Sequence, residues 1–296
     1  MKRRTLLQWS ALAAGGHAAA QARPPLTRPI PSTGEAIPVV GLGTWITFNV
    51  GQDPPARAEC ANVVRAFLDG GGRVIDSSPM YGSSQGVVGE ALQKLAAQPR
   101  VFSADKVWTG SDGATQIETS RRLWQVPKFD LVQVHNLLAW EKQMPLLQAM
   151  KAQGAVRYIG ITTSEGRRHR EIEEVMRSRR IDFVQLSYNL LDREVEQRLL
   201  PLAAERGIAV LVNRPFQEGD LLRRLQRHPL PPWAAEIECT SWAQFALKFV
   251  ISHPQVTCAI PATRRVDHVR ENLGAARGRL PDEAMRRRMA AHVAGL

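Results

Sequence analysis

The stretch Val74-Ile-Asp-Ser-Ser-Pro-Met-Tyr81 decides how the chain is organised. It begins as a short apolar run soon after the turn Gly70-Gly71-Gly72, which is typical of a buried strand. Asp76 stands where that strand should end, and Pro79 prevents regular structure from continuing, so a loop follows. Tyr81 lies five residues after Asp76. A carboxylate at a strand end and a phenol on the following loop can therefore face one pocket.

Short apolar runs of the same kind recur along the chain and alternate with helix-like segments. We expect strands at 38–43, 74–76, 100–108, 130–135, 158–162, 183–186, 208–213 and 257–261. We expect helices at 56–69, 85–97, 115–125, 145–153, 170–177, 194–205 and 242–252, with two more helical stretches finishing the chain. Residues 28–38 predict a small hairpin with its turn at Thr33-Gly34.

This alternation predicts an α/β fold with a parallel sheet, and eight is the number of strands that closes a (β/α)8 TIM barrel. A doubly wound open sheet is the alternative. No G-x-G-x-x-G follows the first strand, which weighs against the dinucleotide-binding form of that fold. The barrel with a short N-terminal hairpin is our prediction.

Residues 1–22 differ in character from the rest of the chain. Lys2-Arg3-Arg4 precedes an alanine-rich run without an acidic residue, and Ala20-Gln21-Ala22 has the small-x-small form of a cleavage site. Arg3-Arg4-Thr-Leu-Leu-Gln8 resembles the twin-arginine export signal. An amphipathic helix is the alternative interpretation. We expect a signal peptide over residues 1–22, removed after Ala22.

Export by the twin-arginine machinery carries folded proteins, so the mature chain, residues 23–296, is expected in the periplasm as one domain. The apolar run is too short and too rich in alanine to remain as a membrane span. The three cysteines are odd in number and lack the spacing of a metal site, so no disulfide framework is indicated.

The chain is basic, with a formal net charge of +11, but only seven of its 39 basic residues are lysines. The arginines fall in helix-like segments, which is typical of solvated helix faces. A nucleic-acid surface would need a concentrated basic patch with aromatic residues nearby, and only 6% of the residues are aromatic. We expect no nucleic-acid partner.

Three consecutive predicted strands end in a chemically active residue: Asp76, Lys106 and His135. In a barrel these strand ends meet at one rim, below the loop that carries Tyr81. An ammonium beside a phenol favours the phenolate, so we expect Lys106 to lower the pKa of Tyr81. We expect Asp76 to hold Lys106 in place and neutral His135 to donate a hydrogen bond to a carbonyl oxygen.

One histidine without further ligands does not make a metal site, so we expect no metal. Proton donation to a carbonyl needs a partner that attacks carbon, and a hydride from nicotinamide is the natural one.

From about Ile30 to Ala275 the chain resembles an aldo-keto reductase. The resemblance rests on Ile37-Pro-Val-Val-Gly-Leu-Gly-Thr-Trp45, Ile75-Asp-Ser-Ser-Pro-Met-Tyr-Gly82, Asp130-Leu-Val-Gln-Val-His-Asn136, Gln185-Leu-Ser-Tyr-Asn189 and Ile260-Pro-Ala-Thr-Arg-Arg265 followed by Glu271-Asn272. The catalytic tetrad of that family falls on Asp76, Tyr81, Lys106 and His135.

The resemblance also implies that NADP(H) binds at the barrel rim without a Rossmann domain. The cofactor-binding residues that it implies are Thr44, Asp76, Thr162, Thr163, Gln185, Asn213, Arg214, Pro215, Phe216, Gly219, Thr263, Arg264, Arg265, His268 and Asn272. Among them, Thr263 to Arg265 match the segment that binds the adenosine 2′-phosphate, and paired arginines suit a phosphate. Trp45 and Trp108 are expected to form an apolar wall of the substrate pocket.

Together these features predict an exported NADPH-dependent reductase of aldehydes or ketones, with Tyr81 as the general acid. The residues allow the reverse oxidation of an alcohol equally well. A redox-sensing or partner-binding module with little turnover, like the potassium-channel β subunits of the family, is the alternative. A nucleic-acid binder is a third and weaker interpretation.

Overall fold

The computed structural model describes residues 23–296, and the predicted signal peptide lies outside this range. The first elements are two antiparallel strands, β1 (Thr27–Pro29) and β2 (Ala36–Pro38). The turn between them closes where the amide of Gly34 donates to the carbonyl of Ile30 over 2.8 Å, with Gly34 at a φ of 78° that favours glycine. The predicted N-terminal hairpin is confirmed.

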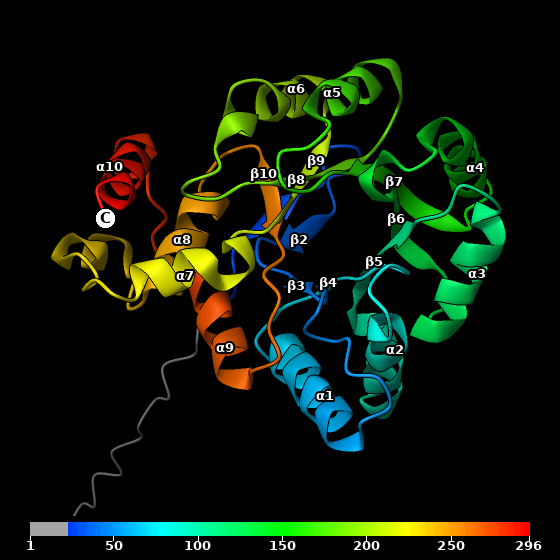
Figure 1. Cartoon of the computed structure of the whole chain (residues 1–296), viewed down its shortest axis with the longest axis horizontal. Helices are drawn as coiled ribbons and strands as arrows, with labels where there is room; N and C mark the ends of the chain where they lie inside the picture. The colour runs from blue at the N-terminus through cyan, green and yellow to red at the C-terminus, as the bar shows by residue number, and fades with distance from the viewer. Residues whose placement is uncertain (1–22) are drawn as a thin grey trace, which may run out of the picture.

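Eight strands form one parallel sheet in which each strand pairs with the next along the chain. They are β3 (Leu42–Gly43), β4 (Val74–Asp76), β5 (Phe102–Val107), β6 (Phe129–Val134), β7 (Val156–Thr162), β8 (Phe183–Ser187), β9 (Ala209–Asn213) and β10 (Val256–Ala259). The sheet curls so that its two ends approach each other (Figure 1), and parallel bridges join Val40 to Ala259 and Gly43 to Ala262. This arrangement is consistent with a (β/α)8 barrel.

Helices surround the sheet (Figure 1). Within residues 23–296 they are α1 (Pro54–Asp69), α2 (Ser84–Lys94), α3 (Gly113–Trp124), α4 (Trp140–Ala152), α5 (His169–Ser178), α6 (Leu199–Arg206), α7 (Asp220–Leu225), α8 (Trp242–Ile251), α9 (Val266–Ala275) and α10 (Glu283–Ala294). The short helix α7, in the segment after β9, was not predicted. None of the helices in this range is long and apolar enough to cross a membrane.

The helix predicted over 194–205 is divided in the structure. A short 3-10 turn covers Glu194–Glu196, and α6 begins at Leu199. Pro201 explains the division, because a proline inside a helix lacks the amide hydrogen and clashes with the carbonyl four residues earlier. In α6 the proline stands in the first turn, where no intrahelical partner is needed.

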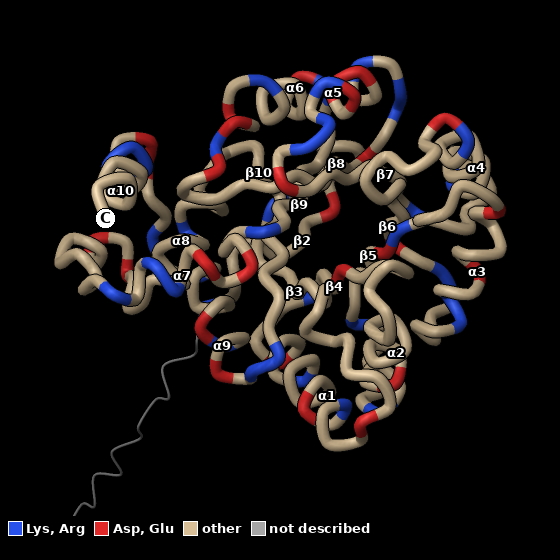
Figure 2. Tube along the Cα trace, viewed as in Figure 1, with Lys and Arg blue, Asp and Glu red and all other residues tan. Residues whose placement is uncertain are grey.

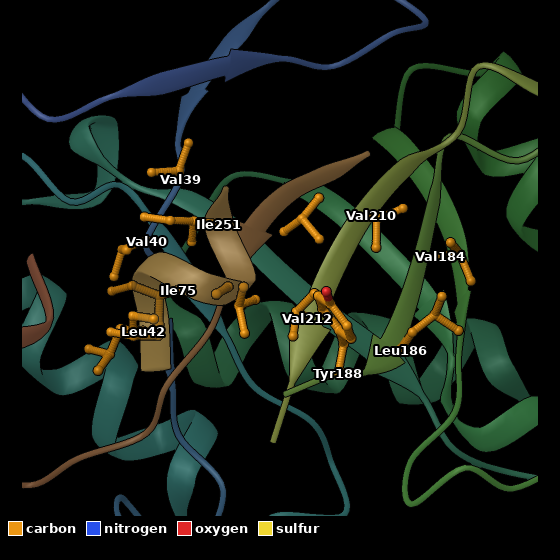
Figure 3. Close-up of a cluster of buried hydrophobic side chains, with 14 of the residues drawn as sticks. Val39, Val40, Leu42, Ile75, Val184, Leu186, Tyr188, Val210, Val212 and Ile251 are labelled. Carbon is orange, nitrogen blue, oxygen red and sulfur yellow. The ribbon is translucent and has the colours of Figure 1, made fainter. Parts of the chain in front are cut away.

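The core has an inner and an outer layer, and the strands contribute to both by alternation. Phe102, Ala104, Leu131, Tyr158 and Phe183 belong to the cluster inside the curled sheet, which Ile30 and Ile37 of the hairpin join. The residues between them belong to a second cluster that also contains buried side chains of the helices. Figure 3 draws members of this cluster, among them Val184, Leu186, Val210 and Val212. The same alternation directs Lys106 of β5 inward, since it continues the series begun by Phe102 and Ala104.

Lysine and arginine are spread over the surrounding helices and loops and are interspersed with acidic residues (Figure 2). Many of them form ion pairs on helix surfaces, such as Arg121 with Glu118 and Arg177 with Glu173. This distribution agrees with the interpretation of the basic excess as solvated helix faces.

Candidate active site

The carboxyl ends of β4, β5 and β6 bring the predicted tetrad together. The ammonium of Lys106 donates to Asp76 Oδ2 over 2.6 Å and to the carbonyl of Ser77 over 2.7 Å. Its nitrogen lies 5.0 Å from the centre of the Tyr81 ring. The Tyr81 and His135 rings meet edge to face with their centres 5.6 Å apart. Residues far apart in the sequence thus share one site, as predicted.

The Lys106–Asp76 pair is almost completely buried, with side-chain exposures of 0% and 2%. Burial alone lowers the pKa of Lys106, but the attraction of Asp76 and Tyr81 outweighs it, so that the pKa is raised. Lys106 therefore remains a cation at the bottom of the site.

The pKa of Tyr81 contradicts our expectation that Lys106 would lower it. Burial raises this pKa, and the Lys106 ammonium offsets only part of the rise, while Asp76 adds to it. The expectation failed because it considered the nearby charge and left out the cost of moving a phenolate out of water. In this structure Tyr81 is a protonated phenol at neutral pH.

His135 is held as a neutral imidazole, in agreement with the sequence-based expectation. Burial, reinforced by the charge of Lys106, lowers its pKa to about 2. The Nδ1 atom lies 2.8 Å from Ser78 Oγ, so Ser78 orients the ring. Ser78 was not singled out from the sequence, because a serine beside a proline has no pattern that reveals a partner 57 residues away.

A chain of hydrogen bonds links the tetrad to the far side of the sheet. Gln185 Nε2 donates to Asp76 Oδ1 over 2.9 Å, and Asn213 Nδ2 donates to Gln185 Oε1 over 3.2 Å. Asn213 also donates to the carbonyl of Thr163 over 2.8 Å. The Thr44 hydroxyl donates to the carbonyl of Asp76 over 2.9 Å. These bonds fix the polar side chains of four strand ends relative to one another.

A cavity of about 460 Å³ opens above these strand ends. Besides Tyr81 and His135, its predicted lining residues are Thr44, Trp45, Asp76, Thr162, Gln185, Asn213, Arg214, Pro215, Phe216, Gly219, Thr263, His268 and Asn272. The volume and the mixture of apolar and polar groups suit a small organic ligand or cofactor.

Five predicted residues do not line this cavity: Lys106, Thr163, Arg264, Arg265 and Trp108. Lys106 is buried behind Asp76 and Tyr81. The Thr163 side chain is buried and its hydroxyl donates to the carbonyl of Arg167. Arg265 pairs with Asp267, with 2.5 Å between the closest atoms. Trp108 is 41% exposed and stands outside the cavity wall. Position in a motif therefore did not determine where these side chains point.

The cavity also includes charged residues that the sequence did not single out, among them Arg167, Arg223 and Glu165. Arg214 pairs with Glu218 of its own loop and approaches Glu165 of the loop after β7 within 3.4 Å. No sequence pattern separates these arginines from the many on helix surfaces. Their role depends on how the loops fold over the rim.

A curled parallel α/β sheet that carries buried Asp, Lys and His side chains and a half-buried Tyr near the carboxyl ends of its strands defines a class of oxidoreductase. Residues 39–292 match the model of the aldo/keto reductase family, so the chain belongs to this family. Within residues 23–296, no group of three or more His, Cys, Asp or Glu side chains is arranged to hold a metal ion.

Among curated proteins, the chain is 30% identical over 246 residues to methylglyoxal reductase YeaE of Escherichia coli, covering 80% of this chain and 84% of that protein. It is 23% identical to an NADH-specific methylglyoxal reductase of the same organism, over 86% of this chain and 94% of that protein. A crystal structure of an aldo/keto reductase from Klebsiella pneumoniae in complex with NADP and acetate has 27% identity and a TM-score of 0.73. It covers 87% of this chain and 93% of that one.

Proposed function

We propose that the protein is an NADPH-dependent reductase that converts an aldehyde or ketone to an alcohol. The observation that carries this proposal is the buried Lys106–Asp76 pair close to Tyr81 and His135, with Asp76, Tyr81 and His135 lining one cavity. Two relatives are named for the reduction of methylglyoxal, so this small dicarbonyl is the first substrate to test.

The site residues divide the reaction between them. His135, neutral and oriented by Ser78, donates a hydrogen bond that places the carbonyl oxygen near Tyr81. When bound, the reduced nicotinamide supplies the hydride to the carbonyl carbon. Tyr81 gives its proton to the oxygen as negative charge develops there. Lys106 stabilises the phenolate that remains, and Asp76 holds the ammonium in place.

The side chains at the cavity fit a phosphorylated dinucleotide. Gln185 and Asn213 present amide groups next to Asp76, where a nicotinamide would face Tyr81. Arg167, Arg214 and Arg223 line the same cavity, each paired with a nearby carboxylate, and would supply guanidinium donors for a pyrophosphate by exchanging those partners. Thr263, His268 and Asn272 line the wall that belongs to the segment after β10, which we assign to the adenosine end.

The choice of NADPH over NADH rests on Arg264. Arg265 is engaged by Asp267, whereas Arg264 forms no ion pair within residues 23–296 and remains available to a 2′-phosphate. The proposed test titrates residues 23–296 with NADPH and with NADH and follows tryptophan fluorescence. Arg264→Ala should weaken NADPH binding about tenfold, leave NADH binding unchanged and exceed the effect of the matched variant Arg265→Ala. Equal NADPH affinity in all three proteins would overturn the assignment.

The alternative of a binding module with little turnover is less well supported. A module without chemistry has no need of an ion pair buried below a cavity, because such a pair is costly to desolvate. Tyr81→Phe separates the two functions. Loss of carbonyl reduction in this variant supports the reductase, and a wild-type chain that binds the cofactor without turning over any carbonyl supports the module.

We also propose that residues 1–22 export the folded protein to the periplasm and are removed after Ala22. The basis is the sequence Arg3-Arg4 before an apolar run. Expression of the full chain with Arg3→Lys and Arg4→Lys should keep the protein in the cytoplasmic fraction. Equal periplasmic yield in the wild type and the double variant would contradict use of the twin-arginine machinery.

A further inference from the structure

Asp105 is a buried carboxylate directly behind the active site that the reaction described above does not use. It precedes Lys106 in β5, and the alternation of the strand therefore turns it away from the barrel interior, toward the helices. It is only 1% exposed. A carboxylate in such a place costs free energy unless its oxygens accept hydrogen bonds.

Both oxygens of Asp105 accept a hydrogen bond from a neutral donor. The amide of Lys106 donates to Oδ1 over 2.7 Å, and Gln85 Nε2 donates to Oδ2 over 2.7 Å. Gln85 Nε2 also lies 2.8 Å from Ser120 Oγ of helix α3. Asp105 therefore joins the backbone of the catalytic lysine to two helices.

The helix reached through Gln85 also carries the Tyr81 loop. Gln85 is the second residue of α2, and the hydroxyl of Ser84 before it donates to the carbonyl of Tyr81 over 2.8 Å. A continuous path of hydrogen bonds and short backbone segments thus leads from Tyr81 to the start of α2, then to Asp105 and the Lys106 amide. This path connects Tyr81 and Lys106, whose relative position matters most for proton transfer, on the side away from the cavity.

We propose that Asp105 is a positioning residue of the reductase site, whose carboxylate joins β5 to α2 and sets where the Lys106 ammonium and the Tyr81 phenol meet. This inference rests on the proposed function. Asp105 touches neither the cavity nor the reacting groups, so it acts through Lys106 and Gln85.

Asp105 also acts on the site through its charge. Burial raises its pKa to about 7, although the bonds from Lys106 and Gln85 and the Lys106 charge oppose the rise. The charged groups that face it are Lys106 and Asp76, while Gln85 of α2 and Ser120 of α3 are neutral. When ionised, Asp105 contributes to raising the pKa of Tyr81, so that Tyr81 keeps its proton to a higher pH.

The test compares Asp105→Asn, Asp105→Leu and Gln85→Leu in residues 23–296, with methylglyoxal and NADPH as the probes. The asparagine can still accept from the Lys106 amide and donate to a rotated Gln85 amide, but it carries no charge. Its kcat at neutral pH should stay within about threefold of the wild-type value. In a plot of kcat against pH, the fall in kcat at alkaline pH, which reports loss of the Tyr81 proton, should move to lower pH. Asp105→Leu and Gln85→Leu should lower kcat about tenfold with little change in KM.

Asp182→Asn is the matched control, because Asp182 is also a buried aspartate, accepting from Lys151 and from the amide of Ile159 away from the cavity. It should lower the thermal midpoint without moving the alkaline fall in kcat. Two results together overturn the proposal: Asp105→Asn leaves the alkaline fall in kcat at the wild-type pH, and Gln85→Leu folds and keeps the wild-type kcat. Gln85→Leu carries the test if Asp105→Leu does not fold. If Tyr81→Phe retains wild-type activity, the proposed function fails instead.

Discussion

The two ends of the barrel carry similar polar side chains and use them differently. At the amino ends of the strands, Arg157 pairs with Asp130 and with Glu35, and Tyr158 donates to Glu35 over 2.8 Å. Glu35 belongs to the hairpin, and Thr33 of the same turn lies 2.8 Å from the Tyr158 hydroxyl. The hairpin thus closes this end of the barrel and partners its polar groups.

At the carboxyl ends the ion pair of Lys106 and Asp76 is buried more deeply, yet a cavity remains above it. Tyr81 and His135 line that cavity, where a substrate can reach them. The difference teaches that strand-end charges become a site when the loops above them leave space, and become a structural contact when another segment fills it.

The largest expected effect follows from breaking the buried ion pair at the carboxyl end. Lys106→Met leaves Asp76 charged and without its partner, which should lower the free energy of unfolding by about 3–5 kcal/mol and abolish reduction. The double variant Lys106→Met with Asp76→Asn should regain much of the stability and none of the activity. Urea unfolding and the reduction rate measure the two effects, and a double variant as unstable as the single one would contradict this account.

The next effect separates activity from stability at the same end. Tyr81→Phe should lower kcat by about 10²-fold or more, because no other group in the cavity can donate the proton as well. The free energy of unfolding should hardly change, since the Lys106 ammonium that the Tyr81 hydroxyl contacts is also held by Asp76 and by the carbonyl of Ser77. Turnover and urea unfolding of the same preparation provide the comparison. A loss of stability equal to the loss of transition-state stabilisation would mean that Tyr81 is a structural residue.

The matched change at the opposite end should give the reverse pattern. Tyr158→Phe also removes one hydroxyl, but this one bonds to Glu35 and Thr33. We expect the free energy of unfolding to fall by about 1 kcal/mol and kcat to stay at the wild-type value. Thermal or urea unfolding measures the change in stability, and a steady-state assay measures kcat. Reduced kcat at full stability would show that the amino end also takes part in catalysis.

The effect that is smallest at neutral pH, and that grows only in acid, concerns His135. The ordinary pKa of histidine is 6.5, and in the folded protein that of His135 lies at about 2. Below pH 6.5 the imidazole of His135 therefore takes up a proton in the unfolded chain but not in the folded protein. The free energy of unfolding falls as the pH decreases below 6.5, and above this value His135 causes no loss. His135→Gln should show a weaker acid loss of stability. In the wild type, kcat should have no inflection from His135 between about pH 5 and 8. An inflection near pH 6.5 that disappears in the variant would contradict the neutral assignment.

The sequence by itself determined the order of strands and helices and the residues at the strand ends. Buried strands alternate with helices in the local pattern, and Asp76, Lys106 and His135 each lie at the end of such a strand, so the shared rim followed from topology. The hairpin at Thr33-Gly34 was equally local. Helix α6 was placed less well, because the effect of Pro201 depends on which residue begins the helix.

Only the tertiary structure decided how these residues behave. The pKa of Tyr81 is raised because its burial, which depends on packing between distant segments, outweighs the charge of Lys106. The contrast between Arg264 and Arg265 depends on where Asp267 lies. The role proposed for Asp105 depends on Gln85, twenty residues away and on another element. Local patterns specify which element a residue belongs to, whereas desolvation and cross-element hydrogen bonds exist only once the elements are packed.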